Sequence, residues 1–184
     1  MGTNLMGKRS DFPKIEKDAY MTTDPRAVRP LFHYLASQME HYDSLLFDYY
    51  EPCVGDGSLK TLLAADGYTC VGHSDLELDA RTTQYDTYAS WFITNPPWTR
   101  EILHPIIENL RKQLPTWLLF DADWMFTAQS NPYMKFCKVV LPIGRLKWIP
   151  GTTDVGKDNC AWYLFVGEET NTTFVPKLPR LSKL

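Results

Sequence analysis

Apolar residues in this chain form either short continuous runs or stripes at helical spacing, and polar turns separate them. The continuous runs predict buried strands at 45–50, 68–73, 91–93, 117–120, 138–141 and 161–166. The stripes predict helices from Pro25 to around 38–42, from near Ser58, and from Thr99 to Gln113. Asp24 or Thr23 is the expected N-cap of the first helix, and Pro25 takes its first position. Pro105 lies inside the third helix, where it removes a hydrogen bond and allows a kink.

The first strand runs directly into the segment Glu-Pro-Cys-Val-Gly-Asp-Gly-Ser at 51–58. Strand, glycine turn and helix in this order open a nucleotide-binding α/β unit. Gly55 can take the positive φ of a tight turn, and Gly57 lets the backbone approach a ligand closely. Glu51 ends the strand with a carboxylate that we expect to face that ligand.

An acidic side chain follows the second strand at the distance where ribose hydroxyls are usually bound. Asp75 stands 18 residues beyond Gly57, and about 20 residues is the usual separation. Glu77 is the alternative for this role. The loop Tyr85–Tyr88 is placed to reach an adenine ring.

The run Trp91-Phe92-Ile93-Thr94 ends in the segment Asn95-Pro96-Pro97-Trp98, which we call the elbow. The prolines cannot continue a strand, so the elbow stands at the carboxyl end of the strand, where ligands bind in open α/β sheets. The Asn95 amide oxygen and the Pro96 carbonyl are acceptors, and Trp98 is a flat ring. Together they suit a planar group that carries an NH2. The alternative is a plain loop boundary with Trp98 in the core.

The size and composition predict one domain. The chain has 184 residues, 44% of them hydrophobic. We expect a polar lead-in at 1–19, a domain at 20–170 and an extended tail at 171–184. No apolar run approaches a membrane span and no secretory signal is evident, so we expect a cytoplasmic protein without a membrane partner. The four cysteines form no C-x-x-C pair, which favours reduced thiols and no metal site.

Charge is unevenly distributed along the chain. The net charge is −3, which argues mildly against a nucleic-acid partner, but the stretch from Asn131 onward is basic. The long loop from Gly144 to Asn159 mixes basic and aromatic side chains suited to phosphate and base contacts. Its candidate DNA-binding residues are Arg145, Lys147, Trp148, Lys157 and Asn159. The alternatives are ordinary surface lysines and a structural loop with a buried Trp148.

The glycine turn at 51–57 followed by the elbow resembles the S-adenosylmethionine-dependent amino-methyltransferases. More narrowly, the chain resembles the small phage-type DNA N6-adenine methyltransferases. The segments Gly144-Arg145-Leu146-Lys147-Trp148 and 156–162 match later blocks of that group, and the block at 20–25 before the glycine turn resembles its gamma arrangement. The elbow departs from the group's commoner Tyr ending by having Trp98, which stacks at least as well.

The resemblance implies a Rossmann-like class I methyltransferase fold. This is an α/β fold with a seven-stranded, mostly parallel sheet, one antiparallel edge strand and helices on both faces. It also implies a set of residues for binding S-adenosylmethionine: Tyr20, Thr22, Thr23, Glu51, Pro52, Gly55, Gly57, Asp75, Asp86 and Asn95. In this set Asp75 accepts from the ribose and Asp86 accepts from the adenine amine. The elbow residues Asn95, Pro96, Pro97 and Trp98 are the implied catalytic group.

The implied reaction is methyl transfer to the N6 amine of adenine in DNA, in the cytoplasm of a bacterial host if a phage encodes the chain. We expect short or relaxed sequence specificity, because the chain leaves no room for a separate recognition domain, and a monomer or weak dimer. Two alternatives stay open. One is an RNA or protein-amide methyltransferase, because the elbow cannot distinguish these amines. The other is a protein that binds S-adenosylmethionine without catalysis.

Overall fold

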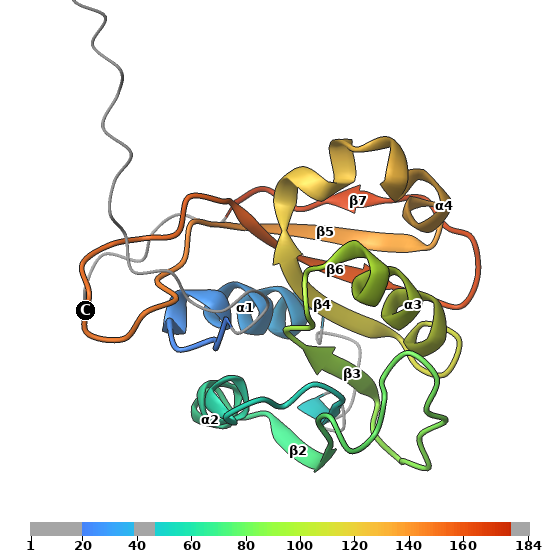
Figure 1. Ribbon diagram of the computed structural model, residues 1–184, viewed down its shortest axis with the longest axis horizontal. Coiled ribbons are helices and arrows are strands. Elements are labelled where there is room, and N and C mark those ends of the chain that lie inside the picture. Colours follow the sequence, from blue (N-terminus) through green and yellow to red (C-terminus); the bar gives the residue numbers. More distant parts are fainter. Residues whose placement is uncertain (1–19, 39–46, 178–184) are drawn as a thin grey trace, which may run out of the picture.

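The computed structural model describes residues 20–38 and 47–177 (Figure 1). In these residues a seven-stranded sheet has the strand order β2-β1-β3-β4-β6-β5-β7. The strands are β1 (Asp48–Glu51), β2 (Thr69–His73), β3 (Trp91–Thr94), β4 (Thr116–Asp121), β5 (Cys137–Gly144), β6 (Cys160–Phe165) and β7 (Thr173–Phe174). The lead-in at 1–19, the start of the first predicted strand and the expected helix end beyond Gln38 lie outside the described residues.

The helices follow the predicted stripes. A 3₁₀ helix at Pro25–Ala27 leads into α1 (Arg29–Gln38), and its N-cap is Asp24, whose Oδ1 accepts a 3.1 Å hydrogen bond from the Arg26 N–H. The remaining α-helices are α2 (Ser58–Ala65), α3 (Arg100–Leu110) and α4 (Asn131–Met134). Two further 3₁₀ helices precede α4, at Ala122–Phe126 and Ala128–Ser130. Helix α3 continues through Pro105, which lies on its exposed side.

The sheet is mostly parallel, and its antiparallel strand is in an unexpected place. Strand β1 pairs in parallel with β2 and β3, β3 with β4, and β5 with β7. Strand β6 runs antiparallel to both neighbours, β4 and β5. The prediction of one antiparallel strand is therefore confirmed, but its placement at the edge is wrong. All six residues of β6 are buried, as an interior strand requires.

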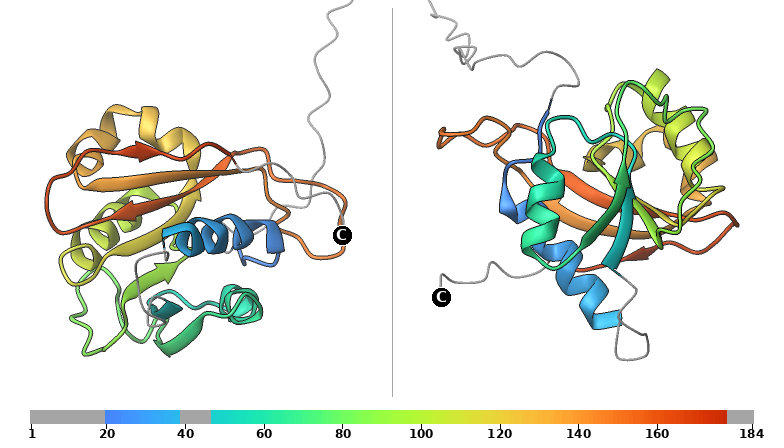
Figure 2. Two further views of the ribbon diagram at one scale, coloured as in Figure 1. Left: turned by 180° about the vertical axis from the view of Figure 1, so that it is seen from behind. Right: turned by 90° about the horizontal axis from the view of Figure 1, so that it is seen from below.

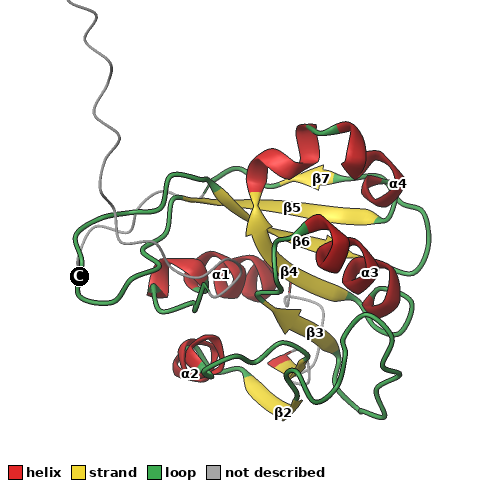
Figure 3. Ribbon diagram, viewed as in Figure 1, coloured by secondary structure: helices red, strands yellow, loops and turns green. Residues whose placement is uncertain are grey.

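The edges of the sheet are β2 and β7. Strand β7 is two exposed residues long and lies within the stretch expected to be an extended tail. Between β2 and β3 the described chain has neither helix nor strand, only a loop (Figure 3). We call the segment 75–90 the β2–β3 loop.

Helices cover both faces of the sheet, as expected (Figure 2). One core lies under α1 and α2 and buries Leu31, Leu59, Leu63, Trp117 and Trp162. The other lies under α3 and buries Phe92, Leu103, Ile107, Phe120 and Tyr163. Successive residues of β4, such as Trp117 and Leu118, point into opposite cores. This packing confirms the predicted α/β architecture and leaves the carboxyl ends of β1, β2 and β3 on one edge.

Candidate functional site

The turn after β1 has the backbone that its glycines predict. Gly55 has φ +54° and Gly57 has φ +78°, values that residues with a Cβ rarely adopt. Gly57 is the N-cap of α2, and the Asp56 carboxylate accepts a 2.9 Å hydrogen bond from the Ser58 N–H. The turn thus joins the end of β1 to the start of α2 in a tight bend.

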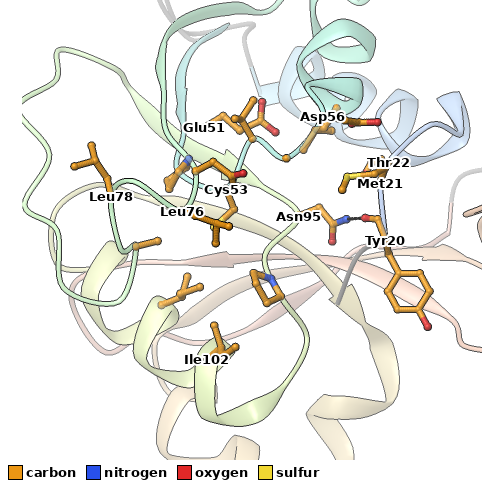
Figure 4. A pocket seen from close by; sticks show the side chains of 18 of the residues that line it. Tyr20, Met21, Thr22, Glu51, Cys53, Asp56, Leu76, Leu78, Asn95 and Ile102 are labelled. Carbon is orange, nitrogen blue, oxygen red and sulfur yellow. Dashed lines mark hydrogen bonds between the residues drawn. The ribbon is translucent and has the colours of Figure 1, made fainter. Parts of the chain in front are cut away.

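A cavity of about 510 Å³ lies against this turn (Figure 4). Three elements of the predicted site meet in it: the segment before the first helix, the turn after β1, and the elbow after β3. Of the residues predicted to bind a cofactor or to act in catalysis, those that line it are Tyr20, Thr22, Glu51, Pro52, Gly55, Asp75, Asn95 and Pro97. Stretches far apart in the sequence therefore share one hollow, on the sheet edge where α/β ligands bind.

Glu51 is the most unusual side chain of the cavity. It is 1% exposed, and neither carboxylate oxygen has a hydrogen-bond partner in the described structure. Burial raises the pKa of Glu51 to about 8; the negative charge of Asp56 adds to the shift and the positive charge of Lys60 opposes it. Thr22 is also buried, and its hydroxyl is also without a partner. Buried polar atoms are almost always satisfied, so these two point to a ligand with hydrogen-bond donors.

Asn95 stands at the carboxyl end of β3 and is half-buried, with its side chain at the cavity (Figure 4). Its Nδ2 donates to the carbonyl oxygen of Tyr20 at 2.7 Å, and its Oδ1 accepts from the indole Nε1 of Trp98 at 3.0 Å. A carbonyl can only accept and an indole N–H can only donate, so the two contacts fix which end of the amide is oxygen.

Trp98 belongs to an aromatic cluster next to the cavity. Its ring centroid is 5.7 Å from that of Tyr20 and 5.4 Å from that of Trp148, and Tyr20 and Trp148 are 5.6 Å apart. Trp148 is buried, so it supports Trp98 and Tyr20 from below instead of offering its own face to a partner. The Lys147 N–H donates to the Asp24 carboxylate at 2.9 Å, which joins this loop to the segment before α1.

The β2–β3 loop forms the outer wall of the cavity. The residues of this loop that line it are Asp75, Leu76, Leu78, Asp79, Ala80 and Arg81. Leu76 is 94% exposed although it borders the cavity. An apolar side chain in this position gains burial when a flat apolar group enters. Across the cavity, Ile102 and Ile106 of α3 complete an apolar end suited to a purine.

Five of the residues predicted to bind the cofactor or to act in catalysis do not line the cavity. Asp86 is exposed and lies outside the lining set, while Asp79 and Ala80 of the same loop are in it. Thr23, Gly57, Pro96 and Trp98 lie beside the lining residues in sequence. The residues that sequence reasoning missed are Met21, Cys53, Val54, Asp56, Leu59, Leu76, Leu78, Asp79, Ala80, Arg81, Ile102 and Ile106. Met21, Cys53, Val54 and Asp56 lie inside the segments 20–25 and 51–58 that carried the prediction. Leu76 and Leu78 carried a separate signal, as apolar residues in a polar loop.

The predicted DNA-binding loop is divided between surface and core. Arg145, Lys157 and Asn159 are exposed and Lys147 is half-buried, whereas Trp148 packs inward. The carbonyl of Asn159 accepts a 2.8 Å hydrogen bond from the N–H of Ala122, just after β4. The loop is therefore attached to the same carboxyl edge of the sheet as the cavity.

None of the helices in the described part of the chain has the length and apolar character needed to cross a membrane. Among residues 20–38 and 47–177, no group of three or more His, Cys, Asp or Glu side chains is arranged to hold a metal ion.

The architecture is that of the class I S-adenosylmethionine-dependent methyltransferases. A type I restriction-modification methyltransferase subunit from Streptococcus thermophilus superposes with a TM-score of 0.53 at 11% identity, over 88% of this chain and 48% of that one. A candidate class I methyltransferase from Listeria monocytogenes superposes with a TM-score of 0.52 at 8% identity, over 89% of this chain and 66% of that one. A candidate RNA methyltransferase from Pyrococcus horikoshii superposes with a TM-score of 0.50 at 12% identity, over 77% of this chain and 84% of that one.

At such low identities, these superpositions show the fold alone. The chain spans about half the length of the Streptococcus protein and just under two thirds of the Listeria protein. No protein-family model and no curated protein matches the sequence. The substrate and the roles of the site residues must therefore be inferred from the geometry of the site.

Proposed function

We propose that this protein transfers a methyl group from S-adenosylmethionine to the N6 amine of adenine in DNA. The observation that carries the proposal is that the unpartnered Glu51 carboxylate and the Asn95 amide line one cavity. The Glu51 carboxylate lacks a hydrogen-bond partner, which a ligand with donor groups would supply. The Asn95 amide offers an acceptor to a planar amine. The two steps of methyl transfer, holding the donor and presenting the acceptor, need these two groups side by side.

The chemistry of the cavity residues fits the donor. Glu51 and Thr22 offer buried acceptors to its ammonium and hydroxyl groups, and Asp75 stands where a ribose is usually bound. Gly55 keeps the turn open, because a Cβ there would come within 3.0 Å of the Met21 sulfur. Leu76, Ile102 and Ile106 offer apolar contacts to the adenine end.

The bound donor would supply an electrophilic methyl on its sulfonium. The protein's task is to position the acceptor amine, whose lone pair is delocalised into the purine ring. Asn95 Oδ1 and the Pro96 carbonyl would accept the two N–H bonds of that amine and so turn its lone pair toward the methyl. The hydrogen bonds of Asn95 with the Tyr20 carbonyl and the Trp98 indole fix the orientation of the amide, which supports this role.

A duplex target must be flipped out of the base stack to reach Asn95, at a cost of a few kcal/mol. Stacking on an aromatic side chain returns about 1–3 kcal/mol per base. Tyr20 and Trp98, packed on the buried Trp148, would supply this aromatic surface beside the cavity. The exposed Arg145 and Lys157, on a loop tied to the same sheet edge, would contact the phosphates. The proposal includes short or relaxed sequence specificity and no metal ion.

The test offers the purified protein tritiated S-adenosylmethionine with DNA, RNA and protein in parallel, followed by nucleoside analysis. The proposal expects label in DNA as N6-methyladenine. Label confined to RNA or to glutamine side chains would show that DNA is not the substrate, while the proposed donor site would stand. Donor binding without label in any acceptor would leave a binding protein and contradict the proposal.

A further inference from the structure

The β2–β3 loop forms one wall of the donor cavity, yet it belongs to no helix or strand (Figure 3). A loop of this length pays a large conformational entropy when it is ordered, so something must hold it. Its inner end is anchored by an aromatic side chain. The ring of Tyr85 lies 4.9 Å from that of Tyr50 and 5.2 Å from that of Phe92. The part that lines the cavity, from Asp75 to Arg81, is held differently.

Two amide side chains at the end of α3 hold the backbone of this loop. Asn109 Nδ2 donates to the carbonyl of Ala80 at 3.0 Å and to that of Thr83 at 2.8 Å. Gln113 Nε2 donates to the same Thr83 carbonyl at 3.1 Å, and its Oε1 accepts from the Tyr85 N–H at 2.8 Å. We call Asn109 and Gln113 the amide clamp. Ala80, which lines the cavity, is thus fixed by a residue that does not.

Asn109 lies on the same stripe of α3 as the far wall of the cavity, and Gln113 lies in the turn directly after the helix. Ile102 and Ile106 line the cavity, and Asn109 and Gln113 follow them at three- and four-residue spacing. Helix α3 begins just after the elbow, at Arg100. Helix α3 therefore affects the cavity in three ways. It fixes the chain directly after the elbow, it supplies the apolar wall of Ile102 and Ile106, and through Asn109 it positions the β2–β3 loop.

We propose that Asn109 and Gln113 are positioning residues that hold the β2–β3 loop in the conformation that binds the nucleoside end of the methyl donor. The inference rests on the proposed function, since it takes the cavity to be a donor site. It assigns a role to two side chains that do not line the cavity. Without the clamp, the residues from Asp75 to Arg81 would still be present, but the loop that carries them would be mobile. Donor binding would then have to order the loop, and the entropy lost in this step would weaken the affinity.

The experiment compares Asn109→Ala with Lys112→Ala, an exposed residue in the turn after α3 that forms an ion pair with Glu108. Calorimetry with S-adenosylmethionine should show at least about tenfold weaker binding for Asn109→Ala and no change for Lys112→Ala. Asn109→Ala loses three hydrogen bonds to the loop: two to the carbonyls of Ala80 and Thr83, and one that Asn109 Oδ1 accepts from Gln84 Nε2. The rate at saturating donor should stay within about twofold of wild type in both. Gln113→Glu, which keeps the acceptor for Tyr85 but loses the donor to Thr83, should weaken binding by about threefold.

Trypsin cleavage after the exposed Arg81 reports on the loop itself. It should be faster in Asn109→Ala than in Lys112→Ala, and saturating donor should slow it, since cleavage follows the population of the open loop. Equal donor affinity of wild type and both clamp variants would overturn the clamp while leaving the donor site intact. A loss in rate at saturating donor with unchanged affinity would overturn it too. If the wild type does not bind the donor, the proposed donor site is wrong, and the role proposed for the clamp is wrong with it.

Discussion

The indole Nε1 of Trp98 donates a 3.0 Å hydrogen bond to Oδ1 of Asn95, three residues earlier in the elbow. Together with the bond from Asn95 Nδ2 to the Tyr20 carbonyl, it fixes the orientation of the amide. A tyrosine or phenylalanine in place of Trp98 has a ring for stacking but no ring N–H at this position. The tryptophan therefore combines two tasks in this chain: it supplies an aromatic surface and it orients the Asn95 amide, for which we propose the catalytic role.

The first prediction separates these two tasks. Trp98→Phe keeps an aromatic ring and removes the N–H, so the Asn95 amide loses one of its two fixed partners. We expect kcat for DNA methylation to fall about tenfold, the equivalent of one hydrogen bond, with donor affinity unchanged. Steady-state kinetics and calorimetry measure the two quantities. A kcat equal to that of the wild type would mean that the indole N–H plays no part in orienting Asn95.

The second prediction concerns pH. The pKa of Glu51 is raised by burial to about 8, above the ordinary value of 4.5. The stability associated with its protonated form is therefore complete below about pH 4.5 and is lost as pH rises toward 8. In the protein without donor, Glu51→Gln should remove this slope, a difference on the order of a few kcal/mol by pH 8. Urea unfolding at several pH values tests it, and parallel pH profiles for the two proteins would speak against it.

The donor should reverse this shift. Donor groups placed against Glu51 favour its carboxylate, so binding below pH 8 should release protons from the wild type. Calorimetry in two buffers of different ionisation enthalpy measures that release. Glu51→Gln should bind the donor more weakly and release fewer protons. The same proton release from both proteins would show that Glu51 does not face the donor.

The third prediction concerns the glycine turn. Gly55→Ala places a Cβ at φ +54° and within 3.0 Å of the Met21 sulfur at the cavity wall. We expect donor affinity to fall at least tenfold, together with a loss of stability of about 1–2 kcal/mol. Gly67→Ala is the matched control, because Gly67 also has a positive φ, +90°, but nothing lies within 4 Å of its Cβ position. Its stability should fall similarly with no effect on the donor.

The fourth prediction concerns the basic loop. The double variant Arg145→Ala with Lys157→Ala removes two exposed charges from the loop between β5 and β6. DNA affinity should fall, and the slope of log K against log salt should decrease by about two, one for each lost phosphate contact. Lys138→Ala, an exposed lysine on β5, serves as the control. An unchanged salt slope in the double variant would place the DNA on another surface.

Much of the fold could be predicted because the relevant signals are local. The turn after β1 depends on glycines at fixed spacing, and the elbow depends on two prolines directly after an apolar strand. Both were placed correctly from a few adjacent residues. The position of β6 inside the sheet could not be predicted in this way, since a buried apolar run is the same for an interior strand of either direction. Strand β7 is two residues long and has no pattern to detect.

The site was only partly predictable, for a different reason. Strand ends gave Glu51, Asp75 and Asn95, because a residue that ends a parallel strand must lie at the ligand edge. The β2–β3 loop has no periodicity, so which of its residues face the cavity depends on contacts with α3. Asp86 was selected by resemblance, yet it lies outside the lining residues, while Leu76 and Asp79 are among them. Long-range hydrogen bonds from Asn109 and Gln113 decide this, and no local pattern encodes them.

The most direct test of the account is methyl transfer to DNA by Asn95→Ala measured beside its donor affinity. The variant loses the amide that would receive the adenine amine, but keeps Glu51, Thr22 and the glycine turn. We predict that tritiated methyl incorporation into N6-methyladenine falls by at least about a hundredfold, as for loss of a group that acts in the transition state. S-adenosylmethionine should still bind within a few-fold of wild type. Undiminished incorporation by Asn95→Ala would contradict the proposed mechanism.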